Sequence, residues 1–139
     1  MEKLEHIGIA VRDLEKANEI FFRLLGKSHY KIEDVESEGV RTSFFQLGDV
    51  KIELLEAQGE NSPIQKFIDK KGEGLHHVAF QVADLAKTLK ECQENGFVAV
   101  NDLPKKGADN KMICFLHPKS TGGLLIELCQ EISIAASTG

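Results

Sequence analysis

Four polar residues of metal-binding type occupy strand-like positions where apolar residues are the rule. His6 and His77 each open a short apolar run, and Glu53 and Glu127 each stand between an isoleucine and a leucine. An ionised carboxylate is costly inside an apolar strand unless a partner stabilises it. Two imidazoles and two carboxylates suit a divalent first-row metal whose remaining positions are open to water or substrate. We therefore predict that His6, Glu53, His77 and Glu127 bind one metal ion.

The same four residues fall at matching places of an internal repeat. The segment that begins at His6 matches the one that begins at His77, 71 residues later (77 − 6), with His, Val, Asp, Leu and Lys in register. The Ile-Glu-Leu sequence at residues 52–54 recurs at residues 126–128, 74 residues later (126 − 52). Two matches in the same order indicate a duplicated fold unit. Pseudo-twofold symmetry between the copies would gather the two histidines and the two glutamates at one place.

Each copy has the pattern of a βαβββ module. Residues 7–11 and 78–82 are short apolar runs rich in β-branched side chains, which is typical of strands. Asp13 and Asp84 follow, each where a helix N-cap belongs, and an amphipathic segment comes after each of them. Further strands are expected at residues 40–47, 50–55, 112–116 and 124–129.

A helical crossover is expected between the two copies. Ser62 precedes Pro63, which is the pattern of an N-cap followed by proline at the first helical position, and Gly72 closes the segment. The sequence thus predicts an α+β fold in which two tandem βαβββ modules form a curled, cup-like mixed sheet. The expected domain covers residues 1–132, with modules at 4–56 and 75–131 and the crossover at 57–74. Residues 133–139 are expected to be a disordered tail.

Composition narrows the classes of function. The net charge is −5 and the pI is about 5.5, which argues against nucleic acid as a partner, because phosphate binding needs a broad basic face. The sequence has no apolar run of the ~18 residues that a membrane span needs. The N-terminus has no signal-peptide pattern, so we expect a cytoplasmic protein. The three cysteines form no Cys-x-x-Cys pair, which argues against a zinc ribbon.

The doubled module with its His, Glu, His, Glu set resembles the vicinal oxygen chelate superfamily. Members of that superfamily include glyoxalase I, extradiol dioxygenases, methylmalonyl-CoA epimerase and metal-free antibiotic-binding resistance proteins. The finer motifs look most like the methylmalonyl-CoA epimerase family. These motifs are Ser-Pro-Ile with Lys-Phe at residues 62–67, Gly-Leu-His-His-Val-Ala-Phe at 74–80, and the long run from Phe115 to Leu128. The resemblance runs from about His6 to Gln130.

The resemblance implies roles for individual residues. His6, His77 and Glu127 fall on metal ligands of that family, and Glu53 falls where the family has a Glu or Gln ligand. The reaction implied is interconversion of (2R)- and (2S)-methylmalonyl-CoA by proton abstraction at C2 through a metal-stabilised enolate. We expect Glu127 to be one base and Glu53 to be the leading candidate for the other. Some members carry a carboxylate on the strand after the first helix, but residues 39–43 have none here.

An acyl-CoA substrate is anionic, and the second half of the chain has a local group of lysines that suits it. Candidate substrate contacts there are Lys111, His117, Lys119 and Ser120. The alternative interpretation of this segment is a solvated lysine-rich loop.

Several alternatives remain open at the level of sequence. Glyoxalase I shares the ligand set and would act on a glutathione hemithioacetal, and a metal-free binding protein of the same fold is the candidate from another class. An extradiol dioxygenase fits less well, because its site usually uses two histidines and one carboxylate. Cobalt is the first choice of metal, with manganese, nickel and zinc as alternatives. The resemblance also suggests a homodimer.

Overall fold

A computed structural model describes residues 1–101 and 103–132, so the expected tail at 133–139 lies outside the described residues. The chain divides into two compact units. One comprises residues 5–78, and the other comprises residues 1–4 with the described residues from 79 onward. No helix in the described part of the chain is long and apolar enough to cross a membrane.

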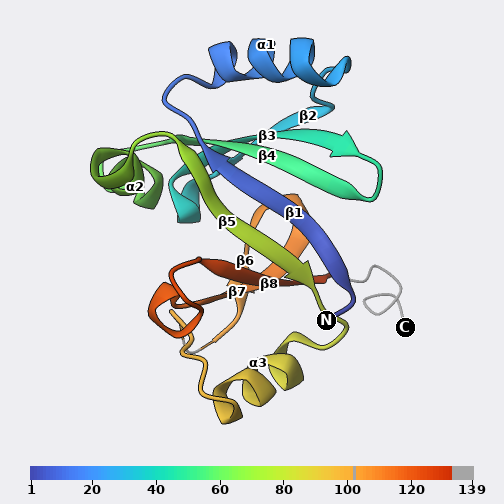
Figure 1. Ribbon diagram of the computed structural model, residues 1–139, viewed down its shortest axis with the longest axis vertical. Helices are drawn as coiled ribbons and strands as arrows, with labels where there is room; N and C mark the ends of the chain where they lie inside the picture. The colour runs from blue at the N-terminus through green and yellow to red at the C-terminus, as the bar shows by residue number, and fades with distance from the viewer. Residues whose placement is uncertain (102, 133–139) are drawn as a thin grey trace. The chain divides into compact units, whose positions relative to one another are not determined.

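The unit of residues 5–78 contains a four-stranded sheet with the order β2-β3-β4-β1 (Figure 1). Strand β1 runs parallel to β4, and the β2–β3 and β3–β4 pairs are antiparallel. The elements are β1 Lys3–Ala10, α1 Leu14–Leu25, β2 Lys31–Val35, β3 Val40–Leu47, β4 Val50–Ala57, α2 Pro63–Lys71 and β5 Gly74–Gln81. The first two residues of β1 and the last three of β5 belong to the other unit.

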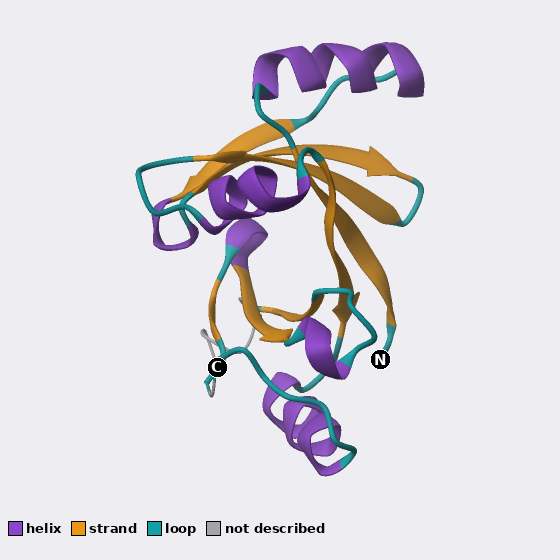
Figure 2. Ribbon diagram, turned by 60° about the vertical axis from the view of Figure 1, so that its left-hand side comes forward, coloured by secondary structure: helices purple, strands orange, loops and turns teal. Residues whose placement is uncertain are grey.

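Helix α1 covers one face of this sheet (Figure 2). It begins as the sequence predicts, because the Asp13 side chain accepts a hydrogen bond from the backbone N–H of Lys16, and it ends at Gly26 in the left-handed conformation. Leu14 and Ala17 point from the helix into a cluster with buried side chains of the sheet, namely Phe45, Ile52 and Leu54. Since strand side chains alternate, Glu53 points to the opposite face.

The predicted crossover helix is confirmed as α2. Ser62 Oγ accepts from the backbone N–H of Ile64 at 3.2 Å, and Pro63 occupies the first helical position. The helix packs Ile64 and Ile68 into a second apolar cluster, which contains Ala10, Val40 and Leu55 of the sheet. This cluster lies on the face opposite α1, so it closes one end of the face to which Glu53 belongs.

The second unit contains α3 Leu85–Glu94, β6 Lys105–Lys106, β7 Lys111–Leu116 and β8 Ile126–Glu131. Strand β7 pairs antiparallel with both β6 and β8. Helix α3 buries Leu85 and Leu89 in a cluster with Cys114 and Leu128 from these strands. Strand β8 starts two residues later than the sequence indicates, because Gly122 and Gly123 both have positive φ and the chain is still turning there.

The two modules share the same internal hydrogen bonds. Val11 N donates to Leu55 O at 2.9 Å, and at the matching place of the second module Val82 N donates to Cys129 O at 2.9 Å. In each module, this bond holds the last strand against the residue that directly follows the first strand. The repeat seen in the sequence is therefore a repeat of backbone pairing.

The helix starts are also equivalent. Besides its own Asp cap, each helix N-terminus has an acceptor from the last strand of its module: Leu14 N donates to Glu56 Oε2 at 2.7 Å, and Leu85 N donates to Gln130 Oε1 at 2.8 Å. A second acceptor satisfies another of the unpaired N–H groups in the first helical turn. The element order along the chain, β1-α1-β2-β3-β4 and then β5-α3-β6-β7-β8, confirms the tandem βαβββ prediction.

Candidate metal centre

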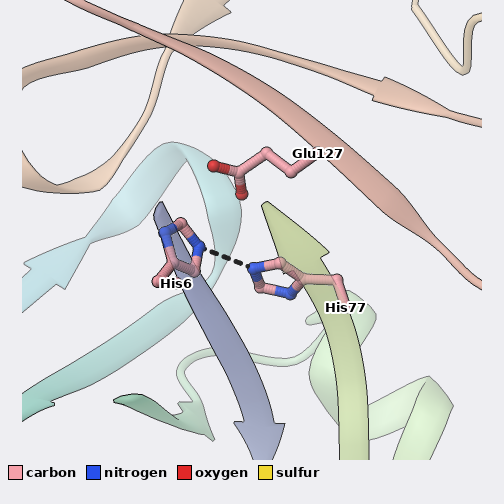
Figure 3. Close-up of side chains that lie close together, drawn as sticks. All are labelled: His6, His77 and Glu127. Atoms are coloured by element: carbon pink, nitrogen blue, oxygen red, sulfur yellow. Dashed lines mark hydrogen bonds between the residues drawn. The ribbon is translucent and has the colours of Figure 1, made fainter. Parts of the chain in front are cut away.

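Two buried histidines face each other in the unit of residues 5–78. His6 of β1 is 5% exposed and His77 of β5 is 4% exposed. Their Nε2 atoms lie 3.0 Å apart, and the rings are nearly perpendicular, with an interplanar angle of 86° (Figure 3). The structure therefore brings together the two histidines that the repeat singled out.

This pair requires a proton. Two unprotonated nitrogens would present lone pairs to each other, so a hydrogen bond forms only if one Nε2 carries hydrogen. Burial, followed by electrostatic interaction with His6 and His76, holds the pKa of His77 well below its usual value. A metal ion bound by both Nε2 atoms would take the place of the shared proton.

Two carboxylates approach the other nitrogen of His6. Glu5 Oε1 lies 2.7 Å from Nδ1, and Glu53 Oε2 lies 3.1 Å from the same atom. A carboxylate can only accept, so Nδ1 donates and Nε2 is the atom presented toward His77. Glu53 thus lies beside His6, on the Nδ1 side of the ring. Glu5, His6 and Glu53 also form a close group of possible metal ligands in their own right.

Glu5 and its partner Lys51 are members of the site that the sequence analysis missed. Glu5 is 3% exposed, and its Oε2 accepts from Lys51 Nζ at 2.8 Å. Burial opposes its ionisation, but the hydrogen bonds from His6 and Lys51, and their charges, prevail and lower the pKa of Glu5 to about 2. The signal available in the sequence was a charged residue directly before His6, inside the strand.

His76 also belongs to the surroundings of His77. Strand alternation sends neighbouring side chains to opposite faces, yet His76 Nδ1 lies 2.9 Å from His77 Nδ1. The His76 ring packs edge-on against Phe67 of α2 at a centroid distance of 4.9 Å. Burial lowers the pKa of His76 to about 4, so it is neutral at pH 7 and holds the ring of His77 by a hydrogen bond.

Gly8 makes room for the His77 ring. A Cβ atom at this position would lie 2.2 Å from His77 Cε1 and 2.6 Å from Nδ1. The β1–β4 register places Gly8 beside Glu53, so this glycine lies between a predicted ligand from the same sheet and the ring. The site therefore requires glycine at position 8 because there is no space for a side chain, and not because of the backbone conformation.

Glu127 lies in β8 of the second unit and is 6% exposed. It is opposite Phe115 in the β7–β8 pair, as Glu53 is opposite Phe44 in the β3–β4 pair. The two glutamates therefore hold equivalent places in their modules, as the repeat predicts. Both are buried carboxylates with side chains on one face of a strand pair.

The four candidate substrate contacts lie in the second unit, and each makes a hydrogen bond within it. Lys111 is buried, with Nζ 3.5 Å from Glu131 Oε1. His117 Nδ1 accepts from the backbone N–H of Lys119 at 3.1 Å, and Ser120 Oγ donates to His117 O at 2.9 Å. His117 and Ser120 thus shape the turn Pro118–Ser120, and Lys119 is exposed on it.

The donor atoms near His6 and His77 fit a divalent metal. Buried imidazoles and carboxylates are typical ligands of cobalt, manganese, nickel and zinc, whereas the three cysteines, which would favour a structural zinc site, are free. Second-sphere partners are also present, because each imidazole has its Nδ1 within hydrogen-bonding distance of another side chain.

Comparison with known proteins identifies the family. Residues 5–115 match the model of the Glyoxalase/Bleomycin resistance protein/Dioxygenase superfamily. The chain belongs to this superfamily, and the α+β fold class predicted from the doubled module is confirmed.

Several relatives and solved structures are named as methylmalonyl-CoA epimerases. The chain is 39% identical to an ethylmalonyl-CoA/methylmalonyl-CoA epimerase of Cereibacter sphaeroides, over 92% of this chain and 97% of that protein. It is 37% identical to the mitochondrial methylmalonyl-CoA epimerase of Mus musculus, over 92% and 72%. A solved Streptomyces coelicolor methylmalonyl-CoA epimerase, in complex with 2-nitronate-propionyl-CoA, is 32% identical with a TM-score of 0.91, and 96% of each chain is covered.

Proposed function

We propose that this chain is a metal-dependent epimerase that interconverts (2R)- and (2S)-methylmalonyl-CoA. The observation that carries the proposal is the buried pair of His6 and His77, whose Nε2 atoms lie 3.0 Å apart, with Glu53 Oε2 3.1 Å from Nδ1 of His6. Relatives that are 37% and 39% identical to this chain over 92% of its length are named as epimerases of this substrate class. Both kinds of support point to proton transfer at the carbon next to a thioester.

The proposed ligands are His6, His77, Glu53 and Glu127. Support for the first three is their proximity within one unit, and support for Glu127 is its equivalence to Glu53 in the module repeat. When bound, the metal would act as a Lewis acid that makes the C2 proton more acidic by stabilising negative charge on the thioester oxygen.

The chain's own carboxylates would move the proton. Epimerisation needs one group that removes the C2 proton from one face and another that returns a proton to the opposite face. Glu127 and Glu53 are the proposed pair, since they are buried carboxylates that come from different modules.

The acyl-CoA would meet the second module through its turn at residues 117–120. We propose the exposed Lys119 as a contact for the anionic part of the substrate, with His117 and Ser120 holding the turn that presents it. Lys111 is proposed as a weaker contact, because it is buried against Glu131. The proposal further includes cobalt as the first metal and a homodimer, both of which rest on the family resemblance. We also propose a cytoplasmic location.

The test is mass spectrometry of methylmalonyl-CoA incubated in D₂O with the cobalt-loaded protein. We expect rapid uptake of one deuterium at C2, and loss of that uptake when a chelator removes the metal. Absence of uptake above the uncatalysed rate would contradict the proposed reaction. A parallel assay with the glutathione hemithioacetal of methylglyoxal would then decide whether the protein is a glyoxalase I, on which the epimerase should be nearly inactive.

A further inference from the structure

Beyond its metal ligands, the first unit contains an ion pair between the partly buried Lys51 and the buried Glu5, and Glu5 touches one of the ligands. Lys51 Nζ lies 2.8 Å from Glu5 Oε2, and Glu5 Oε1 lies 2.7 Å from His6 Nδ1. The side chains form a chain from a cation through a carboxylate to an imidazole. The side chain of Glu5 is 3% exposed and that of Lys51 is 17% exposed, so water competes little for these bonds.

The pair is placed by strand geometry. In the parallel β1–β4 register, His6 lies directly beside Lys51, and Glu5 precedes His6 in β1. Lys51 therefore reaches the carboxylate from the neighbouring strand, while Glu5 reaches the ring of its own neighbour. A buried carboxylate with one oxygen on a lysine and the other on a histidine has little rotational freedom.

The distances rank the two carboxylates that approach His6 Nδ1. A single N–H makes one good hydrogen bond, and the contact of 2.7 Å to Glu5 is shorter than the contact of 3.1 Å to Glu53. Since Glu5 satisfies the N–H, His6 does not require Glu53 to stay beside Nδ1. Glu53 can then serve as a ligand or a base.

From this geometry we infer that Glu5, anchored by Lys51, is a positioning residue that keeps the hydrogen of His6 on Nδ1 and directs the lone pair of Nε2 to the metal. A carboxylate behind a metal-binding histidine fixes the ring's tautomer and orientation and makes the ring a better ligand. Glu5 does not touch the reacting atoms. The inference deepens the proposed metal centre and rests on it for the identity of Nε2 as the ligand atom.

The experiment compares metal affinity and ring protonation in matched variants. Glu5→Met removes the acceptor at similar side-chain length. Glu5→Met/Lys51→Met removes both charges, so that no buried lysine is left without its carboxylate, and such replacement of a buried ion pair is often tolerated. Glu5→Gln keeps an acceptor and serves as the conservative rescue. Glu60→Met, at an exposed position, is the control for loss of a surface glutamate.

Cobalt affinity is measured by competition with a chelator, and the site of the ring hydrogen on His6 by long-range ¹H–¹⁵N spectra of the metal-free protein. We expect cobalt to bind on the order of 10–100-fold more weakly in both Met variants, a smaller loss in Glu5→Gln, and no change in Glu60→Met. The spectra should show the hydrogen on Nδ1 in the natural protein and no longer confined to Nδ1 in the Met variants.

Either of two results in the folded double variant would overturn the inference: cobalt affinity within about threefold of the natural protein, or an unchanged His6 tautomer. Neither measurement uses methylmalonyl-CoA. A protein that fails the deuterium assay but shows these changes would refute the proposed reaction and leave the role of Glu5 standing. If the protein passes the deuterium assay but the Glu5 variants keep their cobalt affinity and His6 tautomer, the proposed reaction stands and the role of Glu5 is refuted.

Discussion

At the scale of single residues, the imidazole of His6 has its two nitrogens in different surroundings. Nδ1 faces the carboxylates of Glu5 and Glu53, and Nε2 faces the imidazole of His77. His77 is arranged similarly, with Nδ1 on His76 and Nε2 toward His6. Each ring therefore has one nitrogen held by the protein and one directed to the position where a metal would bind.

Glu127 is the residue whose replacement tests proton transfer most directly. Glu127→Gln keeps the size of the side chain and an oxygen that can contact the metal, but it removes a group that can accept the C2 proton. We expect deuterium exchange at C2 to fall by at least about 100-fold, since general bases contribute 10²–10⁴-fold, while the Kd for methylmalonyl-CoA changes by less than about threefold. Glu94→Gln, at an exposed position of α3 in the same unit, is the matched control. Equal losses of exchange and binding would contradict the role of base.

Glu5 should make folding stability depend on acid pH. Its pKa falls from 4.5 to about 2 on folding, so the folded state favours the charged form. The resulting stabilisation is complete above about pH 4.5 and is lost as the pH falls toward 2. At pH 7 we expect Glu5→Gln to lower the free energy of unfolding by about 2 kcal/mol, typical of a hydrogen bond to a charged group, and the difference should shrink below pH 4.5. Urea unfolding across pH 2.5–7 measures it, and a difference that grows in acid would refute it.

The internal repeat makes some site residues visible in the sequence, because each has an equivalent residue in the other module. Residues that join the site only through the conformation of their side chains have no such signal. His6 and His77 stand out because imidazoles open two matching apolar runs. Strand alternation gives no reason to place Glu5 or His76 beside the ring of the neighbouring histidine. Their bonds to those rings, at 2.7 and 2.9 Å, depend on rotamers that a pattern of residue types does not contain.

At the scale of elements, the modules hold their glutamates on strands fixed by the same contacts. Each last strand accepts a backbone hydrogen bond from the chain beyond its module's first strand and supplies a side-chain acceptor to the helix N-terminus. Helix starts and the repeat could be predicted because Asp caps and the Ile-Glu-Leu motif are local signals. The short β6, of two residues, could not be predicted, because it exists only through its pairing with β7.

Strand β1 offers a test of the close contact between Gly8 and His77. A side chain at position 8 would overlap the ring, so Gly8→Val should displace His77 Nε2 from His6 and weaken cobalt binding by more than 10-fold, and Gly8→Ala should do so to a smaller extent. Ile9→Val, on the same strand but packed against the α1 cluster, should cost about 1 kcal/mol of stability and leave cobalt affinity unchanged. Isothermal titration with cobalt measures the affinities. Unchanged binding in a folded Gly8→Val protein would show that the ring has room to move.

At the scale of the whole molecule, the proposed ligand set joins residues from both modules, Glu53 from the first and Glu127 from the second. A ligand that binds only the folded protein stabilises it by an amount set by its concentration relative to Kd, about 2.7 kcal/mol at 100 times Kd. If one metal ion uses ligands from both modules, its binding should stabilise the strands of both modules against unfolding. A metal bound by one module alone would protect that module preferentially.

Amide hydrogen exchange with and without metal distinguishes these cases. At cobalt concentrations of about 100 times Kd, slowly exchanging amides in β4 and in β8 should both exchange roughly 100-fold more slowly than in the metal-free protein, because global unfolding becomes rarer by that factor. His77→Ala, which removes a proposed ligand, should abolish the protection in both strands at the same cobalt concentration. Protection of β4 without protection of β8 would mean that the metal is held by His6, His77 and the carboxylates of their own unit. Glu127 would then act on the substrate without binding the metal.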